Sequence, residues 1–405
     1  MARQRASLKC LSMGYVYLSR RATFESTPNP IALALERLQK RGIKPLDLTQ
    51  SNPTLAGFRY RDDAIRAAVS APDVMIYQPS PEGAWQARQA IAEYYRERGC
   101  PVEPEAVLLV SGTSEGYAYL FKLLGDPGDV VLVPKPSYPL LEYLATLESL
   151  ELRRYELVFC DRWQIDFDSL EYAIDDRTRA IVIINPNNPT GSYLKRVELV
   201  SLLELARARH LVLVVDEVFS DFPLELPPDA VTSVAGLDAG PIIVLSGLSK
   251  VAGLPQMKAS WLVVGGPNDF RREITGRLAF IADTYLTVGT PVQAGLPVLL
   301  ELRREFQAQA RERLRHNLER LRALAATKSA CRLLPVEGGW YAVLQLPPGI
   351  DEESWVLALL EEEHVLVHPG YFYDFAGAAC IIVSLLCEPA EFEAGLERLG
   401  RHLPA

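Results

Sequence analysis

Short apolar runs alternate with amphipathic stretches through the middle of the chain. The apolar runs are rich in Val, Ile and Leu and lie at 107–110, 130–133, 180–184, 211–215, 242–245 and 261–264. Most of them are apolar at every position, which is typical of parallel strands that are covered on both faces. The stretches between them are mostly long enough to form a helix. This strand–helix repetition predicts an α/β fold with a mostly parallel, doubly wound sheet.

The pattern changes on either side of this region. Near the N-terminus an Asn-Pro pair and a Gly bound an apolar-periodic segment, 29–42, which predicts a helix. After about residue 290 the pattern predicts one long helix, followed by a mixture of strands and helices. We therefore expect a large domain, a small C-terminal α+β domain, and an N-terminal arm that packs with the small domain. Their expected bounds are 56–290, 291–405 and 1–55.

Composition narrows the class of protein further. The 405 residues are 49% hydrophobic and 23% charged, so the chain can bury a large core and is not disordered. A net charge of -9 argues against a nucleic-acid partner, because such proteins need a basic face. No apolar stretch approaches the ~20 residues that a membrane span requires. The six cysteines include no C-x-x-C pair, so we expect no metal site and a reduced, cytoplasmic protein.

Polar residues follow several of the predicted strands, at the edge of the sheet where α/β folds bind their ligands. Lys250 comes soon after the run 242–245, and Asp216 directly follows the run 211–215. Taken alone, Lys250 is typical of a solvated lysine, and Asp216 of a helix cap or a surface acid. Their alternative roles are a desolvated lysine that forms a Schiff base and a fixed anion that keeps a pyridine nitrogen protonated.

Three more strand ends carry candidate ligands. The segment 111–116 can simply cap a helix, but its exposed backbone N–H groups can also bind phosphate. Asn188, in the segment 185–191, belongs to a turn or donates a hydrogen bond to a phenolate oxygen. Tyr138 is a core residue or stacks on a flat ring. Because all five features follow successive strands, together they predict a site for pyridoxal phosphate.

With these residues, the chain resembles the fold-type-I pyridoxal-phosphate enzymes of the class I/II aminotransferase family. The resemblance runs from about Leu46 to about Leu399 and is most specific at 185–191, 216–219 and 249–258. It implies an aspartate-aminotransferase-like fold, a cytoplasmic homodimer, and transfer of an amino group from an amino acid or related amine to a 2-oxo acid. A lyase or decarboxylase on the same fold remains an alternative, as does a non-enzymatic protein that senses pyridoxal phosphate.

The resemblance also implies a role for each site residue. Lys250 would hold the cofactor and move a proton, and Asp216 would pair with the ring nitrogen. The other cofactor contacts would come from Gly112, Thr113, Ser114, Tyr138, Asn188, Phe219, Ser249, Lys258 and, across a subunit interface, Tyr77. Ser51 and Asn188 would meet the substrate.

The chain departs from the family pattern at three positions. Phe219 replaces a tyrosine, and Lys258 stands where arginine is more common. Ile382 occupies the position of an arginine that grips the substrate carboxylate. An alkyl group cannot make that contact, so we expect the carboxylate partner to lie elsewhere.

Two parts of the chain are candidates for this partner. One is the arm, through Arg20 or Arg21, although exposed arginines are usually solvated. The other is the loop 368–371, which comes before the strand that lacks the arginine. We favour the loop, because a protonated His368 would restore a positive charge near neutral pH.

Overall fold

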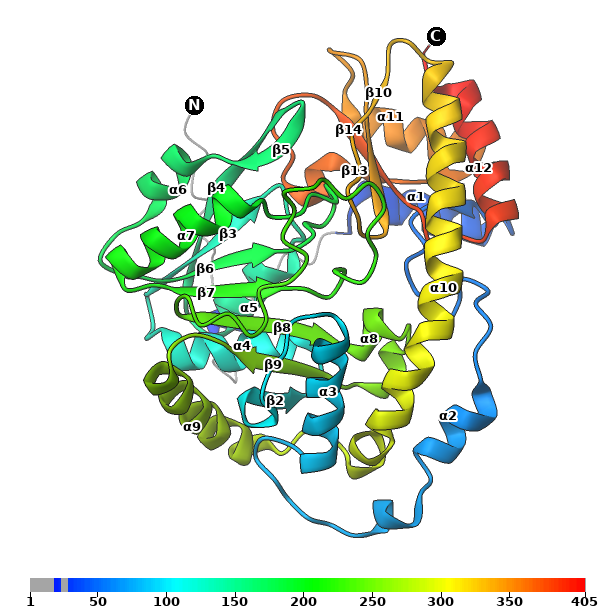
Figure 1. The fold of residues 1–405 in the computed structure, drawn as a ribbon. Coiled ribbons are helices and arrows are strands. Elements are labelled where there is room, and N and C mark those ends of the chain that lie inside the picture. The colour runs from blue at the N-terminus through cyan, green and yellow to red at the C-terminus, as the bar shows by residue number, and fades with distance from the viewer. Residues whose placement is uncertain (1–17, 23–27, 405) are drawn as a thin grey trace.

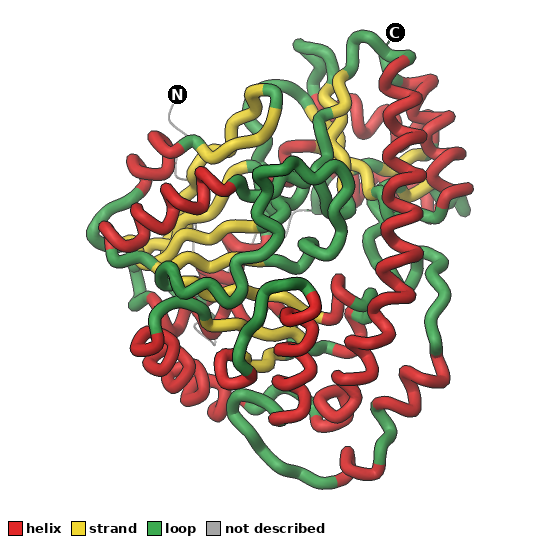
Figure 2. The backbone as a smooth tube through the Cα atoms, viewed as in Figure 1, coloured by secondary structure: helices red, strands yellow, loops and turns green. Residues whose placement is uncertain are grey.

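The computed structural model describes residues 18–22 and 28–404. Figure 1 shows a large sheet with helices on both faces, a smaller sheet beside it, and the long helix α10 (Thr290–Ala326), which runs along both. In the tube view of Figure 2, the strands of the large sheet lie between layers of helix. Within the described part of the chain, no helix combines the length and the apolar character needed to cross a bilayer.

The large sheet contains eight strands in the order β2-β9-β8-β7-β6-β3-β4-β5. Their bounds are β2 (Val107–Val110), β3 (Val130–Lys135), β4 (Glu151–Cys160), β5 (Arg162–Ile165), β6 (Thr178–Ile184), β7 (Val212–Asp216), β8 (Ile242–Gly247) and β9 (Ser260–Val264). Strands β4, β3, β6, β7 and β8 pair in parallel, whereas β9 is antiparallel to β8 and β2, and β5 is antiparallel to β4. The predicted mostly parallel sheet is therefore confirmed, and each of the six apolar runs corresponds to one of these strands.

The hairpin of β4 and β5 is the part of this sheet that the apolar pattern does not predict. Strand β4 carries charged residues such as Arg153 and Arg154, and most of its side chains are partly or fully exposed. It lies next to the edge of the sheet, and only one of its side chains is fully buried. A strand in that position needs no continuous apolar run, so its sequence lacks the signal that marks the central strands.

Helices cover both faces of the large sheet (Figure 1). One face packs against α3 (Trp85–Glu97), α6 (Phe167–Ala173), α7 (Arg196–Arg209) and the first turns of α10. The other packs against α4 (Thr113–Leu124), α5 (Leu140–Leu147) and α9 (Asn268–Tyr285). Apolar side chains fill both layers, which is why the central strands are apolar at every position. This is the doubly wound arrangement that the sequence predicts.

The smaller sheet is antiparallel and has the strand order β10-β11-β14-β13. Its strands are β10 (Arg332–Leu333), β11 (Tyr341–Gln345), β13 (His368–Pro369) and β14 (Cys380–Ser384). Helices α11 (Glu352–Ala358), which continues as the π-helical turn Leu359–Glu363, and α12 (Pro389–His402) share its core with α10. This is the smaller α+β unit that the sequence predicts.

The described part of the N-terminal segment packs with this smaller unit. Helix α1 (Pro30–Lys40) buries Ile31, Ala34 and Leu38 in the same core. Strand β1 (Leu46–Asp47) pairs in parallel with β12 (Val365–Leu366). The remaining short elements are α2 (Asp62–Ala68), α8 (Leu248–Val251) and the 3-10 turns Arg20–Ala22, Pro72–Met75, Pro104–Ala106, Pro255–Met257 and Gly370–Tyr373. The bounds of the expected domains stay a prediction.

The strand directions bring the candidate residues to one edge of the large sheet. Strands β3, β6, β7 and β8 are parallel, so their carboxyl ends lie together. Strand β2 runs the same way as β8, because both are antiparallel to β9. The segments that follow these five strands carry the residues predicted from the sequence, and they form the site described next.

Candidate active site

Lys250 lies in the short helix α8, directly after β8. Its Nζ is 5.3 Å from the ring centre of Trp340 and 5.8 Å from that of Phe219. Burial lowers the pKa of Lys250, and the negative charge of Asp216 opposes this effect. A lysine with a lowered pKa is more often uncharged and therefore a better nucleophile at neutral pH.

Asp216 is the last residue of β7 and is buried. Its carboxylate accepts hydrogen bonds from the Tyr117 hydroxyl at 3.1 Å and from the Val218 N–H at 3.1 Å. Burial raises its pKa to about 6, although these hydrogen bonds and the charge of Lys250 pull the other way. A buried carboxylate of this kind gains stability from a cation placed against it, such as a protonated ring nitrogen.

The start of helix α4 meets a lysine. Gly112 is the N-cap of α4, and among the described residues no side-chain hydrogen bond caps the start of this helix. A Cβ added at Gly112 would lie 3.4 Å from the Nζ of Lys258. Thr113 and Ser114 begin the helix beside this point. Free N–H groups, the helix dipole and a nearby ammonium together favour a bound anion.

The segment 185–191 holds Asn188 in place through its other asparagines. The Asn185 side chain donates to the Val231 carbonyl at 2.8 Å and accepts from the Leu194 N–H at 2.8 Å. Asn187 Oδ1 accepts from the Thr190 hydroxyl at 2.9 Å. Asn188 itself is buried, and its Oδ1 has no hydrogen-bond partner among the described residues. The turn therefore does not use this amide oxygen, which is left for a ligand.

Two aromatic residues lie close to the same edge. Tyr138 is 47% exposed, so it is not a core residue. Phe219 is buried edge-on against Trp340 and Tyr341, with ring centres 5.3 Å and 6.2 Å away. Ser249, the residue before Lys250, is only partly exposed. These positions agree with a flat ligand that lies beside Lys250, while the individual contacts stay a prediction.

Strand β14 presents Ile382 to the large domain. Ile381 and Val383 point into the core of the smaller unit, so Ile382, between them, faces the other way. There it packs with Trp163 of β5 and with Tyr373. The position that carries an arginine in the resembling family is therefore part of an apolar cluster, as the isoleucine led us to expect.

His368 lies beside this cluster, in surroundings that disfavour the expected charge. Its Nδ1 is 3.0 Å from the Tyr373 hydroxyl. Burial lowers the pKa of His368 below its ordinary value, and Asp47 only partly opposes this. Burial therefore disfavours the protonated imidazole expected from the sequence, and the role of His368 stays a prediction.

The arginine candidates of the arm lie on the outside of the molecule. Arg20 and Arg21 are both exposed. The Arg21 guanidinium donates to the carbonyl of Leu147 at 3.3 Å, at the end of α5. Helix α5 starts at the site edge of the sheet, so its end lies at the opposite edge. Within one chain, these arginines are far from Lys250.

Two other predicted residues have different surroundings. Ser51 lies beside Tyr341, whose pKa burial raises to about 12 while a hydrogen bond to the Ser51 side chain lowers it. Tyr77 is 75% exposed and lines a groove with Ser80 and Gln293, a groove to which no residue around Lys250 contributes. Ser51 is thus brought to the site within one chain, and Tyr77 is not.

Sequence reasoning did not predict the aromatic side chains that the smaller unit contributes to the site. Trp340 and Tyr341 pack against Phe219. Burial raises the pKa of both Tyr341 and Tyr373, and nearby Tyr138 adds to the rise in each; Tyr341 also raises the pKa of Tyr373. The available signal was the pair Gly338-Gly339 in front of two aromatic residues. Its location opposite Lys250 depends on how the two units pack.

Several known proteins are similar to this chain. Residues 44–399 match the family model Aminotransferase class I and II. The chain is 29% identical over 395 residues to the alanine aminotransferase of Mycobacterium tuberculosis, a match that covers 92% of this chain and 89% of that relative. It is 30% identical over 285 residues to the glutamate-pyruvate aminotransferase of Escherichia coli, covering 67% of each. The solved structure of the alanine aminotransferase from Pyrococcus furiosus superposes with a TM-score of 0.83 at 26% identity, covering 95% of this chain and 99% of that one.

Proposed function

Because the chain belongs to the class I and II aminotransferases, and is an aminotransferase, we propose that it works with pyridoxal phosphate bound through Lys250. The observation that carries this proposal is the geometry around Lys250: a lysine with a lowered pKa, a buried Asp216, and a helix start beside Lys258 at one edge of the sheet. The relatives reported above are named aminotransferases, so the lyase and sensor alternatives are not favoured.

The residues present fit this cofactor. The start of α4 and Lys258 offer donors for its phosphate, and Asp216 offers an anion for its ring nitrogen. Asn188 is buried, and its Oδ1 has no partner among the described residues; its NH2 group would be the donor to the 3′-oxygen, while Oδ1 could accept from the substrate. When bound, the cofactor supplies an electron sink, and Lys250 provides a base that can hold and return a proton.

The proposed substrates are an amino acid or related amine as donor and a 2-oxo acid as acceptor. The names of the relatives, alanine and glutamate-pyruvate aminotransferases, support small donors of this class. Ile382 lies in an apolar cluster and burial disfavours a charge on His368, so we expect the donor's carboxylate to meet neutral groups. We propose the backbone at Ser51, the Asn188 amide and the His368 ring for this contact.

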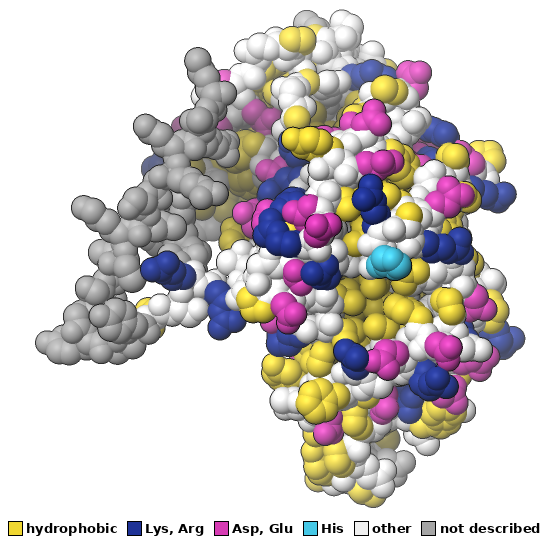
Figure 3. Space-filling view, turned by 90° about the vertical axis from the view of Figure 1, so that its left-hand side faces the viewer, with side chains coloured by type: hydrophobic (Ala, Val, Ile, Leu, Met, Phe, Trp, Pro, Cys, Tyr) yellow, Lys and Arg dark blue, Asp and Glu magenta, His cyan; other side chains and the backbone are white. Residues whose placement is uncertain are grey.

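We further propose that two chains assemble as a cytoplasmic homodimer. Met75 and Tyr77, in the segment after α2, are 86% and 75% exposed, which is unusual for two large apolar side chains so close together. Figure 3 shows hydrophobic side chains gathered at the lower end of the molecule, where Figure 1 places this segment. The five cysteines that the structure describes are free thiols, as is usual in a reducing compartment.

Reduction of the protein with borohydride tests the role of Lys250. We expect the protein purified with pyridoxal phosphate to be yellow, and mass mapping after reduction to find the cofactor on the peptide that contains Lys250. Lys250→Ala should lose this link and the activity. Lys40→Ala is the matched control, because Lys40 pairs with Glu36 on the exposed face of α1. A cofactor attached to another lysine would contradict the proposal.

A further inference from the structure

A lysine outside the proposed site is completely buried. The Nζ of Lys195 lies 2.7 Å from Glu337 Oε2, and the two side chains are 0% and 10% exposed. Lys195 comes from the loop after β6, whereas Glu337 precedes β11 of the smaller sheet. The ion pair therefore connects the two units of the chain in their interior.

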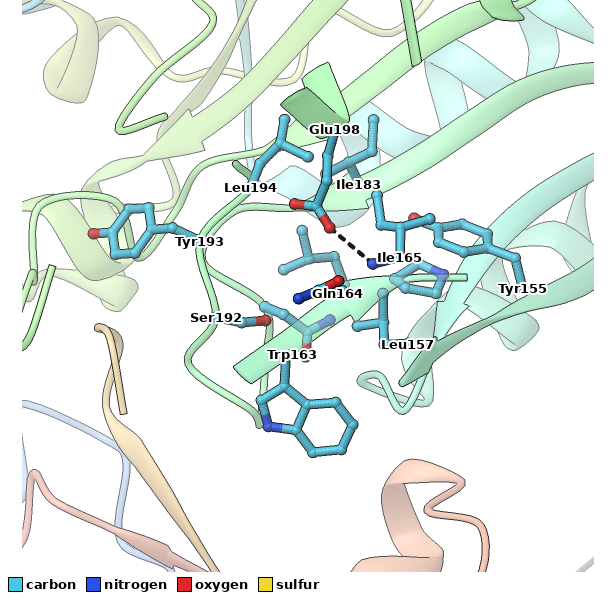
Figure 4. Close-up of a pocket in the computed structure, with 13 residues that line it drawn as sticks. Tyr155, Leu157, Trp163, Gln164, Ile165, Ile183, Ser192, Tyr193, Leu194 and Glu198 are labelled. Carbon is cyan, nitrogen blue, oxygen red and sulfur yellow. Dashed lines mark hydrogen bonds between the residues drawn. The ribbon is translucent and has the colours of Figure 1, made fainter. Parts of the chain in front are cut away.

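The start of helix α7 does not require the lysine side chain. Lys195 is the N-cap of α7, a position that usually holds an oxygen-bearing side chain. Here Glu198 Oε2 accepts from the Lys195 N–H at 2.8 Å, and its Oε1 accepts from the Ile165 N–H at 2.8 Å. Figure 4 shows this second bond, beside a pocket along which Ser192, Tyr193 and Leu194 run. The side chain of Lys195 is thus free to reach the Tyr193 carbonyl and Glu337.

The ion pair is the centre of a joint between three segments: 187–195, 219–225 and 336–340. Glu337 accepts from the Tyr193 N–H at 2.7 Å through its side chain and from the Leu224 N–H at 2.9 Å through its carbonyl. The next two residues, Gly338 and Gly339, donate to the carbonyls of Gly191 and Phe222, each at 2.9 Å.

The backbones of two of these segments, 187–195 and 336–340, are in direct contact. A Cβ added at Gly191 would lie 2.6 Å from the Gly338 carbonyl oxygen, so only a glycine fits there. The ion pair and these close backbone contacts leave the three segments little freedom to move apart.

Each segment of the joint carries a side chain that lies around Lys250 or belongs to the proposed site. These are Asn188, Phe219 and Trp340. A buried ion pair is expensive to desolvate, and an apolar pair of similar volume often gives at least equal stability. Stability alone is therefore a weak reason for its presence at this place.

We propose that Lys195 and Glu337 are positioning residues, which hold Asn188 and Trp340 in a fixed position relative to each other at the proposed site. The inference rests on the proposed function for what that site binds. It concerns the geometry of the site, and neither residue is assigned contact with cofactor or substrate.

The double variant Lys195→Met/Glu337→Gln separates positioning from stability. The introduced glutamine would keep an acceptor for the Tyr193 N–H, and no unpaired charge would remain buried, so the melting temperature of the cofactor-free protein should stay near that of the unchanged chain. Lys195→Met alone leaves the Glu337 charge unpaired and should unfold at a clearly lower temperature. If the pair positions the site, the double variant should bind pyridoxal phosphate about tenfold more weakly and turn over about tenfold more slowly, despite its unchanged melting temperature. The pH midpoint of its visible absorption should also shift.

Lys40→Met is the control. It makes the same lysine-to-methionine substitution in the exposed ion pair of Lys40 with Glu36, and it should change none of these quantities. A double variant whose cofactor affinity, kcat and absorption midpoint all match those of the unchanged chain would overturn the proposal, because the pair would then be only structural.

Hydrogen exchange in the unchanged, cofactor-free chain provides a test that needs no variant. We expect the amides of Tyr193, Gly338 and Gly339 to exchange slowly and at a common rate, as one cooperative unit. Fast exchange at any of the three would overturn the joint. Failure of the unchanged chain to bind pyridoxal phosphate would instead contradict the proposed function, and the exchange result would still decide whether the joint exists.

Discussion

Asp216 makes the stability of the cofactor-free protein depend on pH. Burial raises its pKa to about 6, so the folded state keeps a proton that the unfolded carboxyl has already released. The free energy of unfolding therefore falls as the pH rises from about 4 to about 6, by about 3 kcal/mol in total. Asp216→Asn cannot ionise. We expect its stability relative to the unchanged protein to increase by about this amount between about pH 4 and pH 7 in urea denaturation.

The control for this exchange is Asp238→Asn, because Asp238 is exposed and pairs with Arg271 at 2.9 Å on the surface. Glu217 also has a pKa raised by burial, to about 7, but it contributes the same slope to both proteins. A stability difference that does not vary with pH would contradict the explanation based on burial.

Phe219 leads to a prediction about the proposed cofactor. A tyrosine at this position would donate a hydrogen bond to the cofactor's 3′-oxygen. The 3′-oxygen would then attract less strongly the proton on the nitrogen that joins Lys250 to the cofactor. We expect Phe219→Tyr to lower the pKa of that nitrogen, measured as the pH midpoint of visible absorption. Phe280→Tyr, on the exposed face of α9, should leave the midpoint unchanged. An unchanged midpoint in Phe219→Tyr would show that Asn188 or water already supplies the donor.

At the scale of elements, the proposed phosphate site combines the start of a helix with a lysine from a loop. The Nζ of Lys258 lies close to Gly112 at the N-cap of α4. Lys258→Met removes one charge-assisted hydrogen bond, so we expect about ten- to hundredfold weaker binding of pyridoxal phosphate. Binding of pyridoxal, which has no phosphate, should hardly change. Fluorescence titration of the cofactor-free protein measures both.

Lys122→Met is the matched control, because Lys122 lies in the last turn of the same helix and pairs with Glu148. If pyridoxal and pyridoxal phosphate lose affinity equally in Lys258→Met, then Lys258 does not act on the phosphate.

At the scale of the whole molecule, the proposed homodimer predicts that the exposed Tyr77 affects both assembly and cofactor binding. We expect the chain to sediment at twice its 45.0 kDa. Tyr77→Glu places a charge in the exposed apolar segment, so it should shift the protein toward single chains and weaken pyridoxal phosphate binding. Tyr172→Glu, on α6, is the control, since Tyr172 is 93% exposed away from that segment. A Tyr77→Glu protein that remains a dimer with normal affinity would contradict both expectations.

The sequence by itself determined the large sheet and the side of the site that this sheet carries. An apolar run long enough for a strand is a local feature, and a residue directly after it lies at a known edge once the strands are parallel. Lys250, Asp216, Asn188 and Gly112 could be assigned to one edge for this reason. The β4–β5 hairpin could not be predicted in this way, because its partly exposed strand β4 has no continuous apolar run.

Only the tertiary structure decided what faces that edge. The positions of Trp340 and Tyr341 opposite Lys250, and of Lys195 against Glu337, depend on how two units distant in the sequence pack together. The surroundings of His368 were also decided by tertiary structure. Its unperturbed pKa suggests a proton near neutrality, but the burial that lowers this pKa arises from contacts that no local pattern contains.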